Sequence, residues 1–207
     1  LYYDYALAAP YMAGVTEKEE FQMLILGMGS GTYASQCYNY FDNTVMTGVE
    51  IDKKIIDLAY DRFGLPKDER ITCVEFDGRA YLRGAGKYDL IMVDAYRDVT
   101  IPFQMSSVEF FSEVKKHLAK DGVMVVNLNM YSSTDGSIDK YLCDTVTSVF
   151  DTVYVADRGT NRMVFASNDA DIITRFRDKY PKQDHALSPI LTEVDEKLTA
   201  YKKANNM

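Results

Sequence analysis

Three acidic residues, Glu50, Asp77 and Asp94, each follow or end an apolar run with the length of a buried strand. The carboxyl ends of parallel strands meet at one edge of a sheet, where open α/β sheets bind their ligands. A carboxylate at that edge can accept hydrogen bonds from ribose or an exocyclic amine, or take a proton from an amine. We therefore expect Glu50 to hold a ribose, Asp77 to receive an adenine amino group, and Asp94 to hold or deprotonate an amine.

Two of these carboxylates also have simpler interpretations. Asp77 directly precedes the segment Gly78–Leu82 and can cap a helix there. Asp94 can cap the loop that follows it, because Asp is common at the start of turns. The sequence leaves these alternatives open.

A glycine-rich turn precedes the first of the carboxylates. The apolar run Met23–Leu26 is followed by glycine at positions 27, 29 and 31, in the pattern G-x-G-x-G. Glycine permits a tight turn and a close approach to a ligand, and the helix that begins there directs free N–H groups at the same place. A dinucleotide fingerprint would need glycine at Thr32, so the spacing favours S-adenosylmethionine or a relative over NAD. A strand-to-helix turn without a ligand is the simpler alternative.

The predicted nucleoside-binding residues share this sheet edge. They are Gly27, Gly29, Ser30, Gly31, Glu50, Ile51, Asp77, Gly78 and Asp94.

Composition restricts the class of protein. With 207 residues and 47% hydrophobic content, the chain is expected to form one domain with short additions. The net charge of −8 argues against nucleic acid as a partner, and no apolar run reaches the roughly 18 residues of a membrane span. The three cysteines show no pairing pattern and the two histidines no metal-ligand spacing, so we expect reduced thiols, no metal site and a cytoplasmic setting.

The chain alternates strand-like and helix-like segments. Strands are expected at 23–26, 44–50, 71–76, 88–93, 123–128, 152–156 and 162–166, the last two forming a hairpin around Asp157–Thr160. A helix over Lys53–Phe63 should bury Ile55, Ala59 and Phe63, and Ser106 with Glu109 reads as a capping box.

This order predicts an α/β fold of the class I S-adenosylmethionine-methyltransferase type. It is Rossmann-like and doubly wound, with a mostly parallel seven-stranded sheet that ends in an antiparallel hairpin. We expect a nucleoside-binding catalytic domain over residues 1–180. A polar tail should follow over 181–207, peripheral and helical near Thr192–Lys203.

Several motifs together resemble the spermidine synthase (polyamine aminopropyltransferase) family. They are the opening segment Tyr2–Pro10 and, in order, LILGMGSG, VEIDKKIIDLA, FDGRAYL, YDLIMVDAY and PFQMSSVEFF. The D-A-Y after the fourth strand is closest to spermidine-synthase-like domains that are often fused to membrane segments. The resemblance implies that Asp94 is the catalytic acid/base and that Tyr2, Tyr3, Tyr96 and Asp98 bind the amine substrate.

The same resemblance implies the ligands and the setting. The co-substrate would be decarboxylated S-adenosylmethionine, or S-adenosylmethionine itself, with no prosthetic group, and the acceptor an amine such as putrescine. A homodimer is one assembly that the family allows. The chain would be cytoplasmic, either alone or as the soluble domain of a larger membrane protein, without membrane contact of its own.

Three departures from the family pattern limit these expectations. The glycine loop has Ser30 where the family usually has Asp, and Arg97 replaces the second Asp of D-S-S-D; we expect Arg97 to point outward. The small N-terminal β-domain is not in the sequence, so we expect a fragment of a longer protein. A methyltransferase and a catalytically degenerate adenosyl-binding domain of a membrane protein are the alternative functions.

Overall fold

The computed structural model describes residues 1–94, 102–129 and 137–201. Their strands form one sheet in the order β3-β2-β1-β4-β5-β7-β6-β8. The five strands from β3 to β5 run parallel, and β7, β6 and β8 continue the sheet antiparallel. The predicted doubly wound, mostly parallel sheet with a terminal hairpin is therefore confirmed.

The elements have the following bounds. The strands are β1 Phe21–Leu26, β2 Thr44–Glu50, β3 Ile71–Glu75, β4 Tyr88–Val93, β5 Leu118–Asn129, β6 Thr152–Arg158, β7 Asn161–Ser167 and β8 Thr199–Ala200. The helices are α1 Tyr3–Ala6, α2 Ala9–Ala13, α3 Thr32–Tyr40, α4 Lys53–Asp61, α5 Gly78–Arg83, the 3₁₀ turn η1 Phe103–Met105, α6 Val108–His117, α7 Ser137–Val149, α8 Ile172–Lys179 and α9 Ser188–Lys197. No helix in these described ranges has the length and apolar character needed to cross a membrane.

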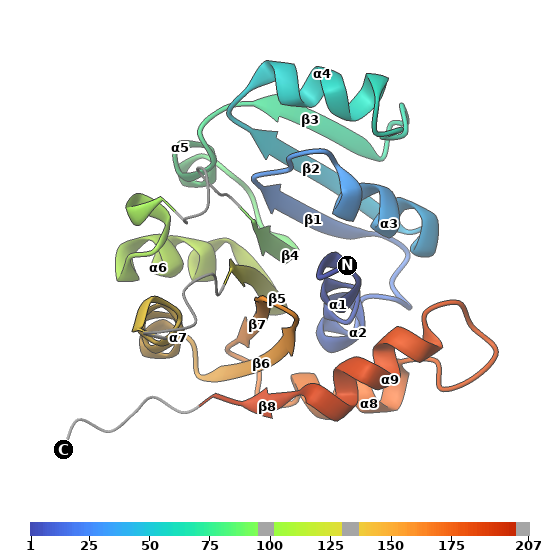
Figure 1. Cartoon of the computed structure of the whole chain (residues 1–207), viewed down its shortest axis with the longest axis vertical. Coiled ribbons are helices and arrows are strands. Elements are labelled where there is room, and N and C mark those ends of the chain that lie inside the picture. The colour runs from blue at the N-terminus through green and yellow to red at the C-terminus, as the bar shows by residue number, and fades with distance from the viewer. Residues whose placement is uncertain (95–101, 130–136, 202–207) are drawn as a thin grey trace.

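Helices cover both faces of the sheet (Figure 1). Strand β1 shows why: Met23 and Ile25 belong to one buried cluster, and Leu24 and Leu26 to the other. Successive strand side chains point to opposite faces, so an uninterrupted apolar strand needs cover on both. Buried residues of α1, α2, α3, α4, α8 and α9 complete the first cluster, and those of α5, α6 and α7 the second.

The strand register brings the predicted site residues together. In the parallel ladders Leu26 pairs with both Val49 and Val93, and Glu50 pairs with Glu75. The strands β1 to β4 therefore end at nearly the same level, and the residues that follow them share one sheet edge.

Two local predictions differ from the structure. On α4 the buried residues are Ile56 and Ala59, whereas Ile55 is 36% and Phe63 is 61% exposed. The chain reaches Phe63 only after the helix has ended at Asp61, so the assumed face does not continue. The cap of α6 is Ser107, whose Oγ accepts from the Phe110 amide, rather than Ser106.

The segment after residue 180 is less peripheral than its polar composition predicts. Its helix, α9, begins at Ser188 rather than near Thr192. Leu187, Leu191 and Val194 are buried in the first cluster. Its two-residue strand β8 pairs with β6, so the sheet has eight strands rather than seven. A few apolar residues at helical spacing are enough to bury one face of a helix. The mean polarity of the segment does not reveal this, because it does not depend on which face each residue occupies.

Candidate functional site

A cavity of about 830 Å³ lies where the strands β1 to β5 end. Its walls come from the glycine turn, the residues after β2, β3 and β4, the turn η1, helix α1 and the β6–β7 hairpin. The described residues that line it are Tyr2, Tyr3, Gly27, Met28, Gly29, Val49, Glu50, Ile51, Ile55, Phe76, Asp77, Gly78, Asp94, Pro102, Gln104, Met105, Asn127, Asn129, Thr160 and Asn161.

Glu50 connects the glycine turn to the end of β2. Its Oε2 accepts from the Gly29 amide at 3.0 Å, and its Oε1 accepts from the amides of Ile51 at 2.9 Å and Asp52 at 3.2 Å. The side chain is only 8% exposed, and a buried carboxylate needs such partners. Since two oxygens offer about four acceptor positions, capacity remains for a ligand hydroxyl. The carboxylate therefore holds the turn in shape and still faces the cavity.

The glycine turn divides into a cavity-facing part and a packing part. Gly27 and Gly29 line the cavity with φ of 81° and 56°, a left-handed conformation that favours glycine. Gly31 has φ of 74°, and a Cβ there would lie 2.8 Å from a methyl group of Leu65. The Ser30 hydroxyl pairs with that of Thr32 at 2.9 Å. Ser30 and Gly31 are not among the described lining residues, so they shape the turn from outside the cavity.

Asp77 has the capping role that was its simpler interpretation. Its Oδ1 accepts from the Ala80 amide at 2.8 Å at the start of α5. Asp77 and Gly78 also line the cavity beside Ile51. A carboxylate has a second oxygen, so the cap does not prevent a contact with an adenine amino group.

Asp94 is the most perturbed carboxyl group of the cavity. Its Oδ1 accepts from Nδ2 of Asn127 at 2.9 Å, and its Oδ2 accepts from the Tyr2 hydroxyl at 3.1 Å. Burial raises the pKa of Asp94 to about 6, and hydrogen bonds from Asn127, Tyr2 and Tyr3 limit that rise. A base of this pKa is mostly ionised at pH 7 and can still accept a proton from a nitrogen that is losing one.

Tyr2 and Tyr3 cover Asp94 from α1. Their ring centroids lie 3.9 Å apart with 38° between the planes, and both line the cavity. Burial and the nearby charge of Asp94 raise the pKa of both hydroxyls, so they stay protonated and can donate. Two other predicted substrate-binding residues, Tyr96 and Asp98, lie outside the described residues, as does Arg97.

The sequence matches the family described as "Spermine/spermidine synthase domain" over residues 6–157. The chain belongs to the spermine/spermidine synthase family. The "Probable polyamine aminopropyl transferase" of Bifidobacterium longum is 53% identical over 171 residues, which cover 80% of this chain and 37% of that protein. The chain thus spans less than half the length of this curated relative.

Solved structures of two kinds share the fold. A probable spermidine synthase from Corynebacterium glutamicum aligns over 98% of this chain and 75% of its own, with TM-score 0.76 and 18% identity. Human methyltransferase-like protein 13, solved in complex with SAH, aligns over 99% and 96%, with TM-score 0.73 and 20% identity. Both likenesses concern the fold, and they place this family member in the methyltransferase-like class predicted from the sequence.

The structure adds site residues that the motifs did not indicate. Asn127 lies near the end of β5, and Asn129, Thr160 and Asn161 line the cavity from β5 and the β6–β7 hairpin. The sequence contained one signal for Asn127, which is a polar residue inside the apolar run 123–128. In the structure Asn127 is only 2% exposed. Its Nδ2 holds Asp94, which explains an amide in a buried strand.

Arg79 supports the cavity wall formed by η1. Its Nη1 donates to the Gln104 carbonyl oxygen at 2.6 Å. Pro102, Gln104 and Met105 line the cavity from this turn. The Arg79 side chain on α5 therefore holds the segment that faces Asp77 and Gly78. Sequence patterns do not predict such a contact between two elements.

Proposed function

We propose that this chain forms an aminopropyltransferase site. It would move an aminopropyl group from decarboxylated S-adenosylmethionine to an amine and release methylthioadenosine. The observation that carries the proposal is Asp94, a carboxylate with a pKa of about 6 that Tyr2 and Asn127 orient inside the cavity. Membership of the spermine/spermidine synthase family supports the same reaction class.

One part of the cavity suits the adenosyl group of the donor, and another part suits the amine of the acceptor. The amides of the glycine turn, Glu50 and the edge formed by Asp77 and Gly78 suit an adenosyl group. Ile51 and Phe76 add apolar surface for the base. Asp94 with the tyrosines suits the reacting amine, which must be neutral to attack.

The reaction needs alignment and one base. The nitrogen lone pair of the acceptor forms a bond to the methylene next to the sulfonium, and the carbon–sulfur bond breaks with its electrons going to sulfur. The leaving group is then a neutral thioether, and the proton lost by nitrogen goes to Asp94. The residues supply orientation and a proton acceptor of suitable pKa.

The carboxylates that line the described part of the cavity favour the decarboxylated donor. Among the described lining residues there are three carboxylates, Glu50, Asp77 and Asp94, and no lysine, arginine or histidine. Intact S-adenosylmethionine would bring a carboxylate into this acidic surrounding. Two like charges 4 Å apart repel by about 1 to 4 kcal/mol, depending on the local dielectric. The decarboxylated donor carries positive charge only.

A methyltransferase using intact S-adenosylmethionine is the second candidate. The likeness to methyltransferase-like protein 13 and the serine at position 30 favour it. A degenerate domain that binds adenosyl ligands without turnover is the third. The acceptor that we propose is a small amine such as putrescine, and a cytoplasmic homodimer is part of the same proposal.

Calorimetric titration with three ligands tests the proposal. We expect methylthioadenosine and decarboxylated S-adenosylmethionine to bind, and S-adenosylmethionine to bind at least tenfold more weakly, in line with 1.4 kcal/mol per factor of ten. Mass spectrometry with putrescine should then show an aminopropylated product. Tighter binding of S-adenosylmethionine, with methyl transfer to any acceptor, would establish the second candidate instead.

A further inference from the structure

The tyrosines that cover Asp94 belong to an element that cannot hold itself in place. Tyr2 is the N-cap of α1 and Tyr3 its first residue, and α1 is a single turn of four residues. A helix this short is unstable alone in water, because its first turn fixes several residues for one hydrogen bond. The contact between Tyr2 and Asp94 therefore depends on what α1 touches elsewhere in the chain.

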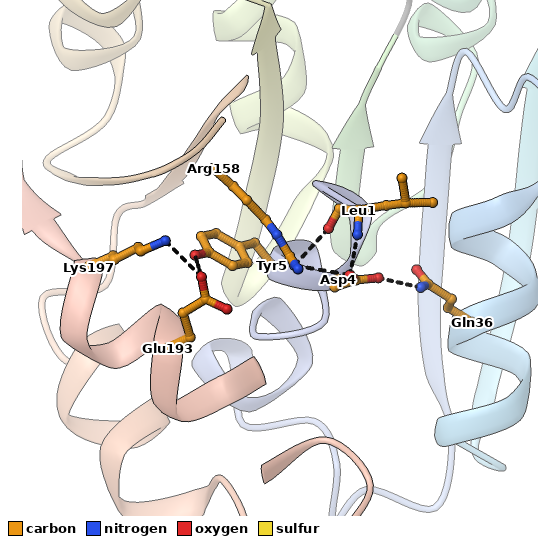
Figure 2. A network of polar contacts seen from close by, with 7 residues as sticks. All are labelled: Leu1, Asp4, Tyr5, Gln36, Arg158, Glu193 and Lys197. Carbon is orange, nitrogen blue, oxygen red and sulfur yellow. Dashed lines mark hydrogen bonds and ion pairs between the residues drawn. The ribbon is translucent and has the colours of Figure 1, made fainter. Parts of the chain in front are cut away.

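Arg158 contacts α1 on both sides of the tyrosine pair. Its Nη1 donates to the carbonyl oxygen of Leu1 at 2.8 Å and to Oδ2 of Asp4 at 3.0 Å (Figure 2). Leu1 precedes the two tyrosines and Asp4 follows them. The guanidinium carbon also lies 5.0 Å from the centre of the Tyr5 ring. One side chain thus brackets the segment that presents Tyr2.

Other contacts hold the part of the turn after the tyrosines. Nε2 of Gln36, on α3, donates to Oδ1 of Asp4 at 2.7 Å. Tyr5 is fully buried, and its hydroxyl donates to Oε1 of Glu193 on α9 at 2.6 Å (Figure 2). Lys197 pairs with Glu193 at 2.7 Å and lies 5.4 Å from the Tyr5 ring. These contacts anchor Asp4 and Tyr5. Leu1 is held by its terminal ammonium, which pairs with Oδ2 of Asp4 at 2.5 Å, and by Arg158, which reaches it from the hairpin (Figure 2).

Arg158 belongs to the hairpin that walls the cavity. It is the last residue of β6 and pairs with Asn161 in the hairpin register. Asn161 and its neighbour Thr160 line the cavity together with Tyr2. The hairpin therefore forms part of the cavity wall and also holds α1. The positions of the wall and of α1 depend on each other for this reason.

We infer that Arg158 is a positioning residue, which holds α1 so that the Tyr2 hydroxyl stays on Asp94. The inference rests on the proposed function for the importance of that hydrogen bond in turnover. Its main test is a titration that needs no turnover.

The test compares variants of the hairpin and of the tyrosine. Arg158→Met removes the guanidinium and keeps much of the stem, and Arg158→Lys keeps the charge. Arg162→Met is the matched control, because Arg162 is on the partner strand of the hairpin and pairs with Asp157 at 2.7 Å. Tyr2→Phe removes the hydroxyl itself. Thermal melts confirm that each variant is folded.

The first measurement is the titration of the Asp94 carboxyl by NMR, with ¹³C-labelled aspartate and assignment through Asp94→Asn. In the described part of the chain, the titratable groups around Asp94 are Tyr2 and Tyr3 on α1, and Glu50 and Asp77 across the cavity. The Tyr2 hydrogen bond lowers the pKa of Asp94, so its loss in Tyr2→Phe, which keeps the ring over the carboxyl, should raise the midpoint above about 6. Arg158→Met releases α1, so Asp94 loses the cover of both tyrosines; because burial is the largest cause of its raised pKa, the midpoint should fall below about 6. Arg158→Lys should move it less, and Arg162→Met should leave it in place.

The double variant Tyr2→Phe/Arg158→Met separates positioning from a direct charge effect. If Arg158 acts by holding α1, removal of the Tyr2 hydroxyl has no further effect once α1 is released, and the double variant titrates like Arg158→Met alone. Additive shifts, or an unchanged midpoint in Arg158→Met, would overturn the inference.

Turnover supplies the second measurement. With a midpoint below about 6, the ionised fraction at pH 6 rises above the roughly one half of the wild type, and at pH 8.5 it hardly changes. Arg158→Met should therefore lose a smaller share of its activity at pH 6 than at pH 8.5, because the acid limb of its pH–rate profile moves to lower pH. An equal loss at both pH values would count against the inference. If the wild type shows no aminopropyl transfer, the proposed function fails, and the titration alone decides the role of Arg158.

Discussion

Replacing Asp94 with asparagine should abolish turnover and stabilise the fold. The amide keeps the shape of the carboxylate, so its Oδ1 can still accept from Asn127 and its Nδ2 can donate to the Tyr2 oxygen. It cannot take a proton, and removing a general base typically lowers the rate by about 10²- to 10⁴-fold. Affinity for methylthioadenosine should change less than twofold, because Glu50, Asp77 and the glycine turn remain.

The gain in stability follows from the direction of the pKa shift. The pKa of Asp94 is raised from 3.8 to about 6, so the folded state binds the proton more tightly than the unfolded state. Asp94 therefore favours folding when protonated, and that contribution is lost as the pH rises through about 6. A shift of this size corresponds to at most about 3 kcal/mol at pH 8. For a chain of this length that is up to about 6 to 12 °C in Tm.

Thermal melts at pH 4 and pH 8 measure this effect. Asp94→Asn should melt higher than the wild type at pH 8, and the difference should shrink at pH 4, where the unfolded-state carboxyl also begins to protonate. Asp89→Asn is the matched control in the same strand. Asp89 pairs with Lys18 at 2.6 Å and accepts from the Gln22 amide at 2.9 Å. Its replacement should lower the free energy of unfolding by about 1 to 3 kcal/mol.

Two results would refute the reasoning. A variant that keeps more than about a tenth of the wild-type rate would make Asp94 a positioning residue rather than the base. A lower melting temperature for Asp94→Asn at pH 8 would show that the ionised carboxylate stabilises the fold, against the raised pKa.

Three further predictions concern the cavity and the core. Glu50→Ala should weaken binding of methylthioadenosine by about 1.5 to 3 kcal/mol, measured by calorimetry, and the wild type should not bind NAD; the reverse preference would contradict the nucleoside assignment. Asn127→Ala removes a hydrogen bond that lowers the pKa of Asp94, so the acid limb of the pH–rate profile should move to higher pH. An unmoved limb would show that Asn127 does not influence the pKa of the base. Leu191→Ala should lower the free energy of unfolding by about 2 to 5 kcal/mol in denaturant melts, whereas Leu58→Ala, at a residue that is 46% exposed, should change it by less than about 0.5. Equal effects of the two leucine variants would show that α9 does not belong to the core.

The sequence by itself determined the fold class and most of the sheet edge that lines the cavity. Apolar runs of strand length separated by helical segments specify a doubly wound sheet, because each run can bury both of its faces only between two layers of helices. The carboxylates at the ends of those runs then meet by topology alone. This is why Glu50, Asp77 and Asp94 line one cavity, as predicted. Local signals were less exact at the helix ends, where the cap was Ser107 rather than Ser106.

Only the tertiary structure decided how Asp94 is held. Its partners Tyr2 and Asn127 are 92 and 33 residues away in sequence, and the Arg158 side chain that holds α1 is 154 residues from Asp4. Contacts over such separations leave no periodic pattern, because each depends on one pair of side chains rather than on a repeating face. The same holds for α9, whose few buried residues are hidden in a polar segment. Burial of Asp94, and with it the raised pKa that suits a base, arises from all these contacts together.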